Sequence, residues 1–227
     1  MSRRLHDPYE TLHNRPKWGF VIYRCDYRND ESWKAFIDKW SDRVKQWLLH
    51  KNASHLVQTL EFTVKEDPAV LDGATVEDVQ GLFTTWTTSE EATAEQRAAW
   101  DNNVGNSARH YFCIHVDAQS LDGCLRYESL PEDTQRKYIF SNRDPSLGQA
   151  AYVNIVEKFQ EVIRLPGSSD NGGNNDEEDD EDEDDEVISI KMHMPFVLPD
   201  AYIALSKMPN LLQSWAQNCE EDGVCLY

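Results

Sequence analysis

Side chains that can transfer protons occur close together in the stretch ARHYFCIHVD, residues 108–117. Its aromatic and β-branched residues predict a β-strand, and alternation along a strand places Tyr111, Cys113, His115 and Asp117 on one face. An imidazole titrates near neutral pH, and a carboxylate on the same face can orient it for general acid–base catalysis. We therefore predict that His115, Asp117 and Tyr111 are the catalytic residues.

Three other predicted strands, at residues 17–25, 151–159 and 186–194, carry polar side chains that suit substrate binding. Alternation gives each strand an apolar face and a more polar one, and it directs Tyr23 and Arg24 to opposite faces. If the strands share one sheet, one face is dry and the other forms the wall of a pocket. The predicted substrate-binding residues are Lys191, His193, Asn154, Tyr152, Arg24 and Tyr23.

Alternatives to acid–base catalysis stay open for this polar face. One alternative is that the face is a solvated surface with incidental polar residues. Another is that His115, His193 and Asp117 together bind a metal ion. Cys113 with His115 suggests a Cys–His nucleophile, but side chains two apart on a strand lie ~7 Å from each other, beyond hydrogen-bond reach. The sequence contains no GxSxG, P-loop, HExxH or kinase signature, and we predict neither a metal nor a cofactor.

A long amphipathic helix is predicted after the first strand, over residues 30–50. Asparagine or aspartate at its start can cap it, and Trp33, Trp40 and Trp47 recur every seven residues along one face. We expect this aromatic stripe to pack on the sheet; the alternative is that it lines a ligand cavity.

The remaining elements are predicted from shorter signals. Residues 55–67 suggest a strand, and the sequence TVED at 75–78 suggests a capping box at the start of a helix. Residues 118–150 are expected to form loops and short turns. Pro199 suits the first turn of a terminal helix, which Pro209 bends or restarts.

This order of elements predicts an α+β fold, with an antiparallel or mixed sheet and helices packed on one face, of ferredoxin-like sandwich character. A doubly wound dinucleotide-binding fold would need a glycine fingerprint after the first strand. The sequence RCDYRND stands there instead.

The most acidic part of the chain is residues 167–186, which end in eleven consecutive acidic residues, Asp176 to Glu186. With Asp170, this segment holds twelve of the 41 acidic residues and leaves 29 against 22 basic residues elsewhere. It has no apolar residue to bury, so we predict a disordered loop inside a single domain at 17–227, preceded by an N-terminal arm at 1–16. Docking of a basic partner and weak calcium binding are the alternatives to a spacer.

Composition limits the partners and the compartment. The net charge of −19 argues against nucleic acid, and no apolar window is long enough to cross a membrane. The start of the sequence lacks the apolar segment of a secretory signal. Five cysteines without metal-ligand spacing suggest buried reduced thiols in a cytoplasmic protein.

Several stretches together resemble a group of uncharacterised proteins from filamentous fungi. The resemblance covers most of residues 17–215 and implies a fungal, intracellular protein, but it transfers no catalytic residue. Some orphan fungal families of this kind act as cofactor-free cyclases in natural-product pathways. The stretches are KWGFVIYRCDYRNDESWKAFI, KEDPAVLDGATVEDV, YFCIHVDAQSL and YVNIV, followed by the acidic run.

The resulting functional hypothesis is a small-molecule-binding protein with an aromatic-lined pocket for a small hydrophobic substrate. Aromatic rings suit such a substrate by shape and by stabilising developing positive charge, as in a cofactor-independent cyclase or isomerase of fungal secondary metabolism. The alternative is a non-catalytic interaction protein that uses the polar sheet face or the acidic loop. A homodimer formed through a sheet face is a further expected partner arrangement.

Overall fold

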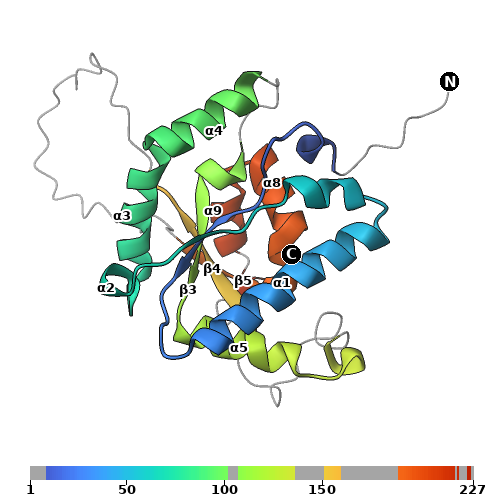
Figure 1. The fold of residues 1–227 in the computed structure, drawn as a ribbon, viewed down its shortest axis with the longest axis vertical. Coiled ribbons are helices and arrows are strands. Elements are labelled where there is room, and N and C mark those ends of the chain that lie inside the picture. Colours follow the sequence, from blue (N-terminus) through green and yellow to red (C-terminus); the bar gives the residue numbers. More distant parts are fainter. Residues whose placement is uncertain are drawn as a thin grey trace, which may run out of the picture.

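The computed structural model describes residues 9–101, 107–135, 151–159, 189–217, 219 and 224–225, which form a mixed sheet between helices (Figure 1). The strand order is β2-β1-β3-β4-β5-β6. Strand β1 is parallel to β2 and β3, whereas β4 is antiparallel to both of its neighbours, and β6 is parallel to β5. The strands are β1 (Val21–Arg24), β2 (Thr63–Lys65), β3 (Phe112–Val116), β4 (Tyr152–Glu157), β5 (Ser189–His193) and β6 (Val224–Cys225).

Helix α1 (Asp30–His50) confirms the predicted long helix. The Asn29 side chain caps it by accepting hydrogen bonds from two backbone N–H groups of the first turn, at 2.9 and 3.1 Å. Trp33 and Trp40 are buried against the sheet, but Trp47 is 40% exposed. Seven residues fall short of two full helical turns, so the stripe drifts by about 40° over two heptads and carries Trp47 away from the sheet.

Helix α5 (Ala118–Glu128) corrects the prediction of loops and turns after the third strand. Asp117 caps it, and its buried residues include Leu121, Cys124 and Tyr127. This helical spacing was present in the sequence, but Gly123 and the nearby polar residues weakened the signal. Helices α1 and α5 contribute to the same large hydrophobic core on one face of the sheet.

Helix α3 (Val76–Thr87) covers the opposite face of the sheet, so the expectation of helices on one face is corrected (Figure 1). Its capping box is formed as predicted, between Thr75 and Asp78. A second, smaller core lies beneath it, because its apolar side is directed at β1, β3 and the Val156 end of β4. The short α2 (Pro68–Leu71) precedes α3, and the separate α4 (Glu90–Asp101) follows it. This core includes Val79, Phe83, Trp86, Val21, Tyr23 and Cys113.

Two N-terminal regions differ from the sequence-based expectation. In the predicted strand at 55–67, residues Ser54–Thr59 form a 3₁₀ helix and only Thr63–Lys65 pair with β1. In the predicted arm, Glu10–Leu12 form a turn of 3₁₀ helix, and Leu12 is buried in the main core. Non-local contacts decide both cases, and local residue preference cannot reveal them.

The C-terminal helices follow β5. A short α7 (Met194–Phe196) and an irregular helical segment, Val197–Ala201, lead to α8 (Tyr202–Lys207) and α9 (Leu211–Ala216). Pro209 lies between α8 and α9, which confirms that the terminal helix restarts there.

The α+β class and the mixed sheet are confirmed, but the parallel strands β2-β1-β3 depart from a ferredoxin-like sandwich. The acidic run at 167–186 lies outside the described residues.

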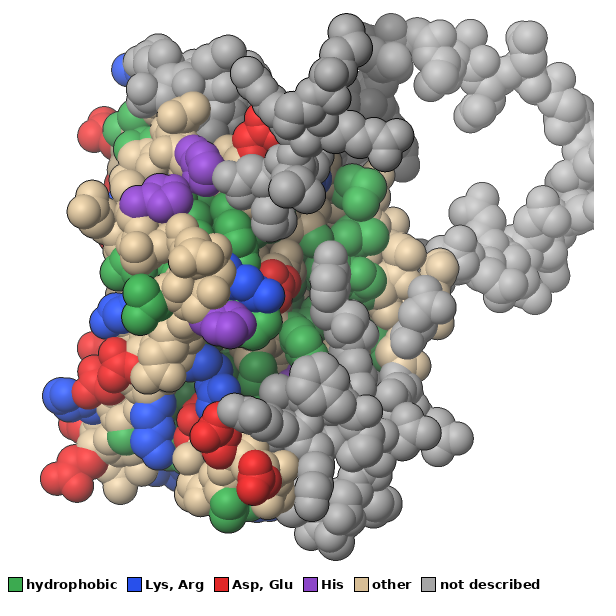
Figure 2. All heavy atoms as spheres, turned by 90° about the vertical axis from the view of Figure 1, so that its right-hand side faces the viewer, with side chains coloured by type: hydrophobic (Ala, Val, Ile, Leu, Met, Phe, Trp, Pro, Cys, Tyr) green, Lys and Arg blue, Asp and Glu red, His purple; other side chains and the backbone are tan. Residues whose placement is uncertain are grey.

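The face that includes α1 carries acidic and basic side chains close together (Figure 2). On α1 itself, Lys34 pairs with Asp38, and Lys45 pairs with Asp42 at 3.4 Å. Exposed pairs of this kind add little stability.

In the described part of the chain, no helix has both the length and the apolar character that a membrane span requires.

Candidate functional site

A groove of about 420 Å³ lies over β4 and β5, and we call it the β4–β5 groove. Val76 at the start of α3 and Ala216 at the end of α9 contribute to its walls. It brings together four of the nine residues predicted from the sequence: Asp117, Tyr152, Asn154 and Lys191.

The strand register explains why these residues meet. His115 of β3 is paired with Asn154 of β4, which in turn is paired with Lys191 of β5. Tyr23 of β1 is paired with His115, so one row of side chains crosses four strands on the same face. Helix α3 covers the Tyr23 end of this row, whereas the Lys191 end lines the groove.

His115 lies beneath the groove, not in it, because it is only 2% exposed. Its Nε2 is 2.9 Å from the carbonyl oxygen of Ala74, and its Nδ1 is 2.9 Å from Nδ2 of Asn154. A carbonyl only accepts, so Nε2 carries the proton and Nδ1 accepts from the Asn154 amide. Both ring nitrogens are occupied, which gives His115 the geometry of a positioning residue.

The contact with His115 fixes the orientation of the Asn154 side chain. Its Nδ2 donates to the imidazole, so the amide cannot turn without bringing an oxygen against the acceptor Nδ1. Asn154 also lines the groove. Among the described residues its Oδ1 has no hydrogen-bond donor, so the carboxamide offers the groove an acceptor.

Asp117 follows the end of β3 and caps α5, with its Oδ1 accepting from Ser120 N at 2.7 Å. The predicted hydrogen-bonded pair with His115 is not formed, since both His115 nitrogens have other partners. Within the described residues the second oxygen of Asp117 has no partner. One carboxylate oxygen therefore caps α5, and the other can accept a hydrogen bond from a ligand in the groove.

Lys191 and Tyr152 lie in contact, with the lysine Nζ 4.9 Å from the centre of the tyrosine ring. Burial, with smaller contributions from Asp117 and Cys124, raises the pKa of Tyr152 to about 12. The phenol therefore stays protonated at neutral pH. No carboxylate of the described residues pairs with Lys191, so its ammonium remains available.

Two predicted residues lie on other parts of the sheet. Tyr23 is 3% exposed and belongs to the smaller core beneath α3. Arg24 is 5% exposed, and its guanidinium lies over the rings of Tyr27 and Trp33, at 4.3 and 5.4 Å. It also pairs with Asp30 at the start of α1. Neither side chain lines the β4–β5 groove.

Tyr111 and His193 are also away from this groove. Tyr111 lines a second groove of about 450 Å³ near the end of α3, where Lys158 Nζ lies 4.7 Å from its ring centre. His193 is fully buried and packs edge-on against Tyr127, with ring centres 5.2 Å apart. The proposed His115–His193–Asp117 metal set is therefore not assembled, and the described residues contain no group of three ligands suited to a metal ion.

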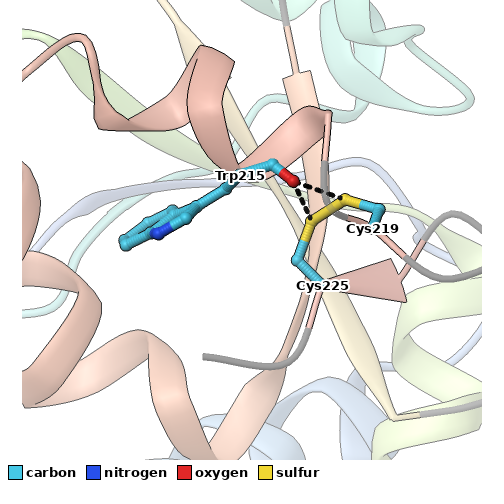
Figure 3. Close-up of a disulfide and its surroundings, with 3 residues drawn as sticks. All are labelled: Trp215, Cys219 and Cys225. Carbon is cyan, nitrogen blue, oxygen red and sulfur yellow. Dashed lines mark hydrogen bonds between the residues drawn. A yellow bond between two sulfur atoms is a disulfide. The ribbon is translucent and has the colours of Figure 1, made fainter.

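A disulfide between Cys219 and Cys225 corrects the prediction of five reduced thiols (Figure 3). Cys219 contributes to the wall of the groove, and the carbonyl oxygen of Trp215 lies against both sulfur atoms. The other three cysteines are free and buried. Burial raises the pKa of the fully buried Cys113 thiol well above its ordinary value, so it does not supply a thiolate nucleophile. The cytoplasmic location stays a prediction.

A buried cluster of charges surrounds Arg109, and no motif in the sequence indicated it. This arginine is 1% exposed and donates to Glu95 at 2.8 Å, to the Gly19 carbonyl at 3.0 Å and to Thr63 at 2.6 Å. Burial opposes ionisation of Glu95, but interactions with His110, Arg109 and Lys17 outweigh it and lower the pKa of the carboxyl. Arg109 lies in a turn of 3₁₀ helix, Ala108–His110, so the predicted strand begins later, at Phe112, and a charged residue next to that strand was the available signal.

The comparisons with known proteins add no functional assignment. No protein-family model, curated protein or solved structure matches this chain. The resemblance to fungal proteins therefore stays an expectation.

Proposed function

We propose that this chain is a small-molecule-binding protein and that its ligand occupies the β4–β5 groove. One observation carries the proposal: Lys191, Asn154 and Asp117 line one cavity, each with a polar group that no described residue pairs. Buried polar groups are normally paired, and Asn154 is only 5% exposed, so its open oxygen beside two half-buried charges at a cavity favours a ligand.

The lining changes the kind of ligand expected from the sequence. Tyr152 is the one aromatic side chain among the described residues that line this groove, and the tryptophans Trp33 and Trp40 pack in the core. The groove therefore favours a polar ligand over the hydrophobic substrate and the aromatic-lined pocket predicted earlier. Lys191 and Asp117 can move protons on a bound ligand, so a cofactor-independent isomerase or cyclase is the enzymatic form of this proposal.

A fragment screen by protein-observed NMR tests the proposal, using wild-type protein and two matched lysine variants. Lys191→Met removes the ammonium from the β4–β5 groove, and Lys158→Met removes the equivalent lysine from a tyrosine ring in the second groove. Fragments are expected to shift the amide signals of β4 and β5. Losing a charge-assisted hydrogen bond costs roughly 1.5–3 kcal/mol, so Lys191→Met should weaken anionic fragments tenfold or more.

The competing role is a surface that binds another protein without chemistry. It predicts no saturable fragment binding at β4 and β5. Binding that Lys158→Met weakens and Lys191→Met leaves intact would place the ligand site in the second groove and overturn the assignment.

A further inference from the structure

The β4–β5 groove offers charges of both signs beside a fixed hydrogen-bond acceptor. Lys191 supplies an ammonium without a carboxylate partner among the described residues. Asp117 supplies a carboxylate with one oxygen held by Ser120 N. His115 holds the amide nitrogen of Asn154, so the oxygen is the open acceptor that this lining residue offers. A ligand that satisfies all three needs one anionic group and one group with several N–H donors.

The positions of these groups limit how far apart the ligand's charges lie. Asn154 and Lys191 are direct cross-strand partners, whose Cβ atoms lie about 5 Å apart in an antiparallel pair. Asp117 comes two residues after His115, the partner of Asn154, so it adjoins Tyr152 at the next position on this face. Lys191 Nζ lies over the same Tyr152 ring. The positive and negative groups therefore flank one aromatic side chain.

We propose that the groove binds a zwitterion of the amino-acid type, with its carboxylate on Lys191 and its ammonium between Asp117 and the Asn154 oxygen. This inference rests on the proposed function, since it names the ligand class of the same groove. The apolar side chains of Val76 and Ala216 also line the groove, so the side chain of the amino acid is apolar.

Other ligand classes satisfy the groove less well. A phosphate ester or a dicarboxylate pairs with Lys191 but brings negative charge towards Asp117. A polyamine pairs with Asp117 but is repelled by Lys191. An uncharged ligand displaces water from both charges without replacing its hydrogen bonds, which lowers affinity.

Isothermal titration calorimetry with four probes of matched shape tests the class. The probes are L-leucine, its hydroxy-acid analogue 2-hydroxy-4-methylpentanoate, the carboxylate 4-methylpentanoate and the amine 3-methylbutylamine. Leucine is expected to bind at least tenfold tighter than each of the other three, because only leucine carries both charges. Lys191→Met should weaken leucine binding at least tenfold, and Lys158→Met should leave it unchanged.

Asp117→Asn sharpens the test, because asparagine also caps helices and keeps α5 intact. In this variant leucine and its hydroxy-acid analogue are expected to bind with similar affinity, since the ammonium has lost its counter-charge. Equal binding of all four probes to the wild type, tightest binding of the carboxylate, or no leucine binding would each overturn the inference. If diverse fragments bind at β4 and β5 while leucine does not, only the ligand class is wrong; if neither binds, the proposed function fails as well.

Discussion

Arg109 and Lys191 are two cationic side chains at the same sheet, in opposite surroundings. Arg109 is almost fully buried, and its guanidinium donates to a carboxylate, a carbonyl and a hydroxyl. Lys191 is partly exposed and contacts a tyrosine ring, with no carboxylate partner in the described part of the chain. Since a buried charge needs partners to be tolerated, the first serves folding, whereas the second is free to meet a ligand.

The sheet face that carries Tyr23, His115, Asn154 and Lys191 shows the same contrast: one half is sealed by α3, and the other half is open at the β4–β5 groove. Over β1, β3 and the Val156 end of β4, helix α3 seals an apolar core that includes Tyr23 and Cys113. Over β4 and β5, Asn154 and Lys191 line an open groove. His115 lies at the boundary and joins the halves through Ala74 on one side and Asn154 on the other. Substitutions in the sealed half should affect stability, and those in the open half should affect binding.

The largest effect is expected for Arg109→Met. This substitution leaves the Glu95 carboxylate without its closest arginine partner and strands the hydrogen-bond acceptors of Gly19 and Thr63. Breaking a buried ion pair by removing one partner costs about 3–5 kcal/mol of unfolding free energy. Urea unfolding of the wild type and the variant measures this loss. A loss below about 1 kcal/mol would remove the distinction between the two cations.

The His115→Leu variant tests the boundary between the halves. It removes the partners of the Ala74 carbonyl and the Asn154 amide, and each unpaired buried group costs about 1–3 kcal/mol. We expect a total loss of about 2–3 kcal/mol, near the lower limit for two such groups because Ala74 is only half-buried, together with weaker ligand binding because Asn154 is no longer oriented. The exposed His55→Leu is the control and should change neither measurement. Unchanged binding in His115→Leu would show that Asn154 does not depend on the imidazole.

A smaller and pH-dependent effect is expected at Glu95. Its pKa in the folded protein is lowered from the ordinary value of 4.5, because its interactions with His110, Arg109 and Lys17 outweigh the effect of burial. A lowered folded-state pKa stabilises the fold above about pH 4.5, and this stability is lost as the pH falls through the folded-state value. Glu95→Gln should therefore reduce stability at pH 7, and its difference from the wild type should shrink at pH 3. A difference that stays constant with pH would mean that the charge of Glu95 contributes nothing.

Local patterns in the sequence were enough to predict helices and strands, but not which distant residues their side chains contact. The Asn29 cap, the Thr75 capping box and the alternation within each strand depend on neighbouring residues, so helices α1 and α3 and the shared face of β3, β4 and β5 were predictable. The partners of His115 lie 41 and 39 residues away, at Ala74 and Asn154. Only the folded sheet shows that this histidine is held from both sides.

Local sequence patterns also could not show that the predicted polar face of the sheet is divided into a covered half and an open half. Alternation assigned Tyr23 and Lys191 to one face, which the register supports. It could not show that α3 crosses that face and covers β1, β3 and the Val156 end of β4, leaving Asn154 and Lys191 at an open groove. The packing of a distant helix decides which polar residues are exposed, and spacing along a strand carries no information about it.

The smallest effect on stability is expected for Lys191→Met, and this makes it the sharpest test of the contrast with Arg109. Methionine keeps an unbranched apolar chain against the Tyr152 ring, and no carboxylate of the described residues loses a partner. Surface substitutions without such partners change the unfolding free energy by less than about 0.5 kcal/mol. Urea unfolding should therefore show wild-type stability, while calorimetry shows weaker ligand binding. A loss of stability comparable to that of Arg109→Met would mean that Lys191 has a structural partner and would remove the main support for a ligand in the groove.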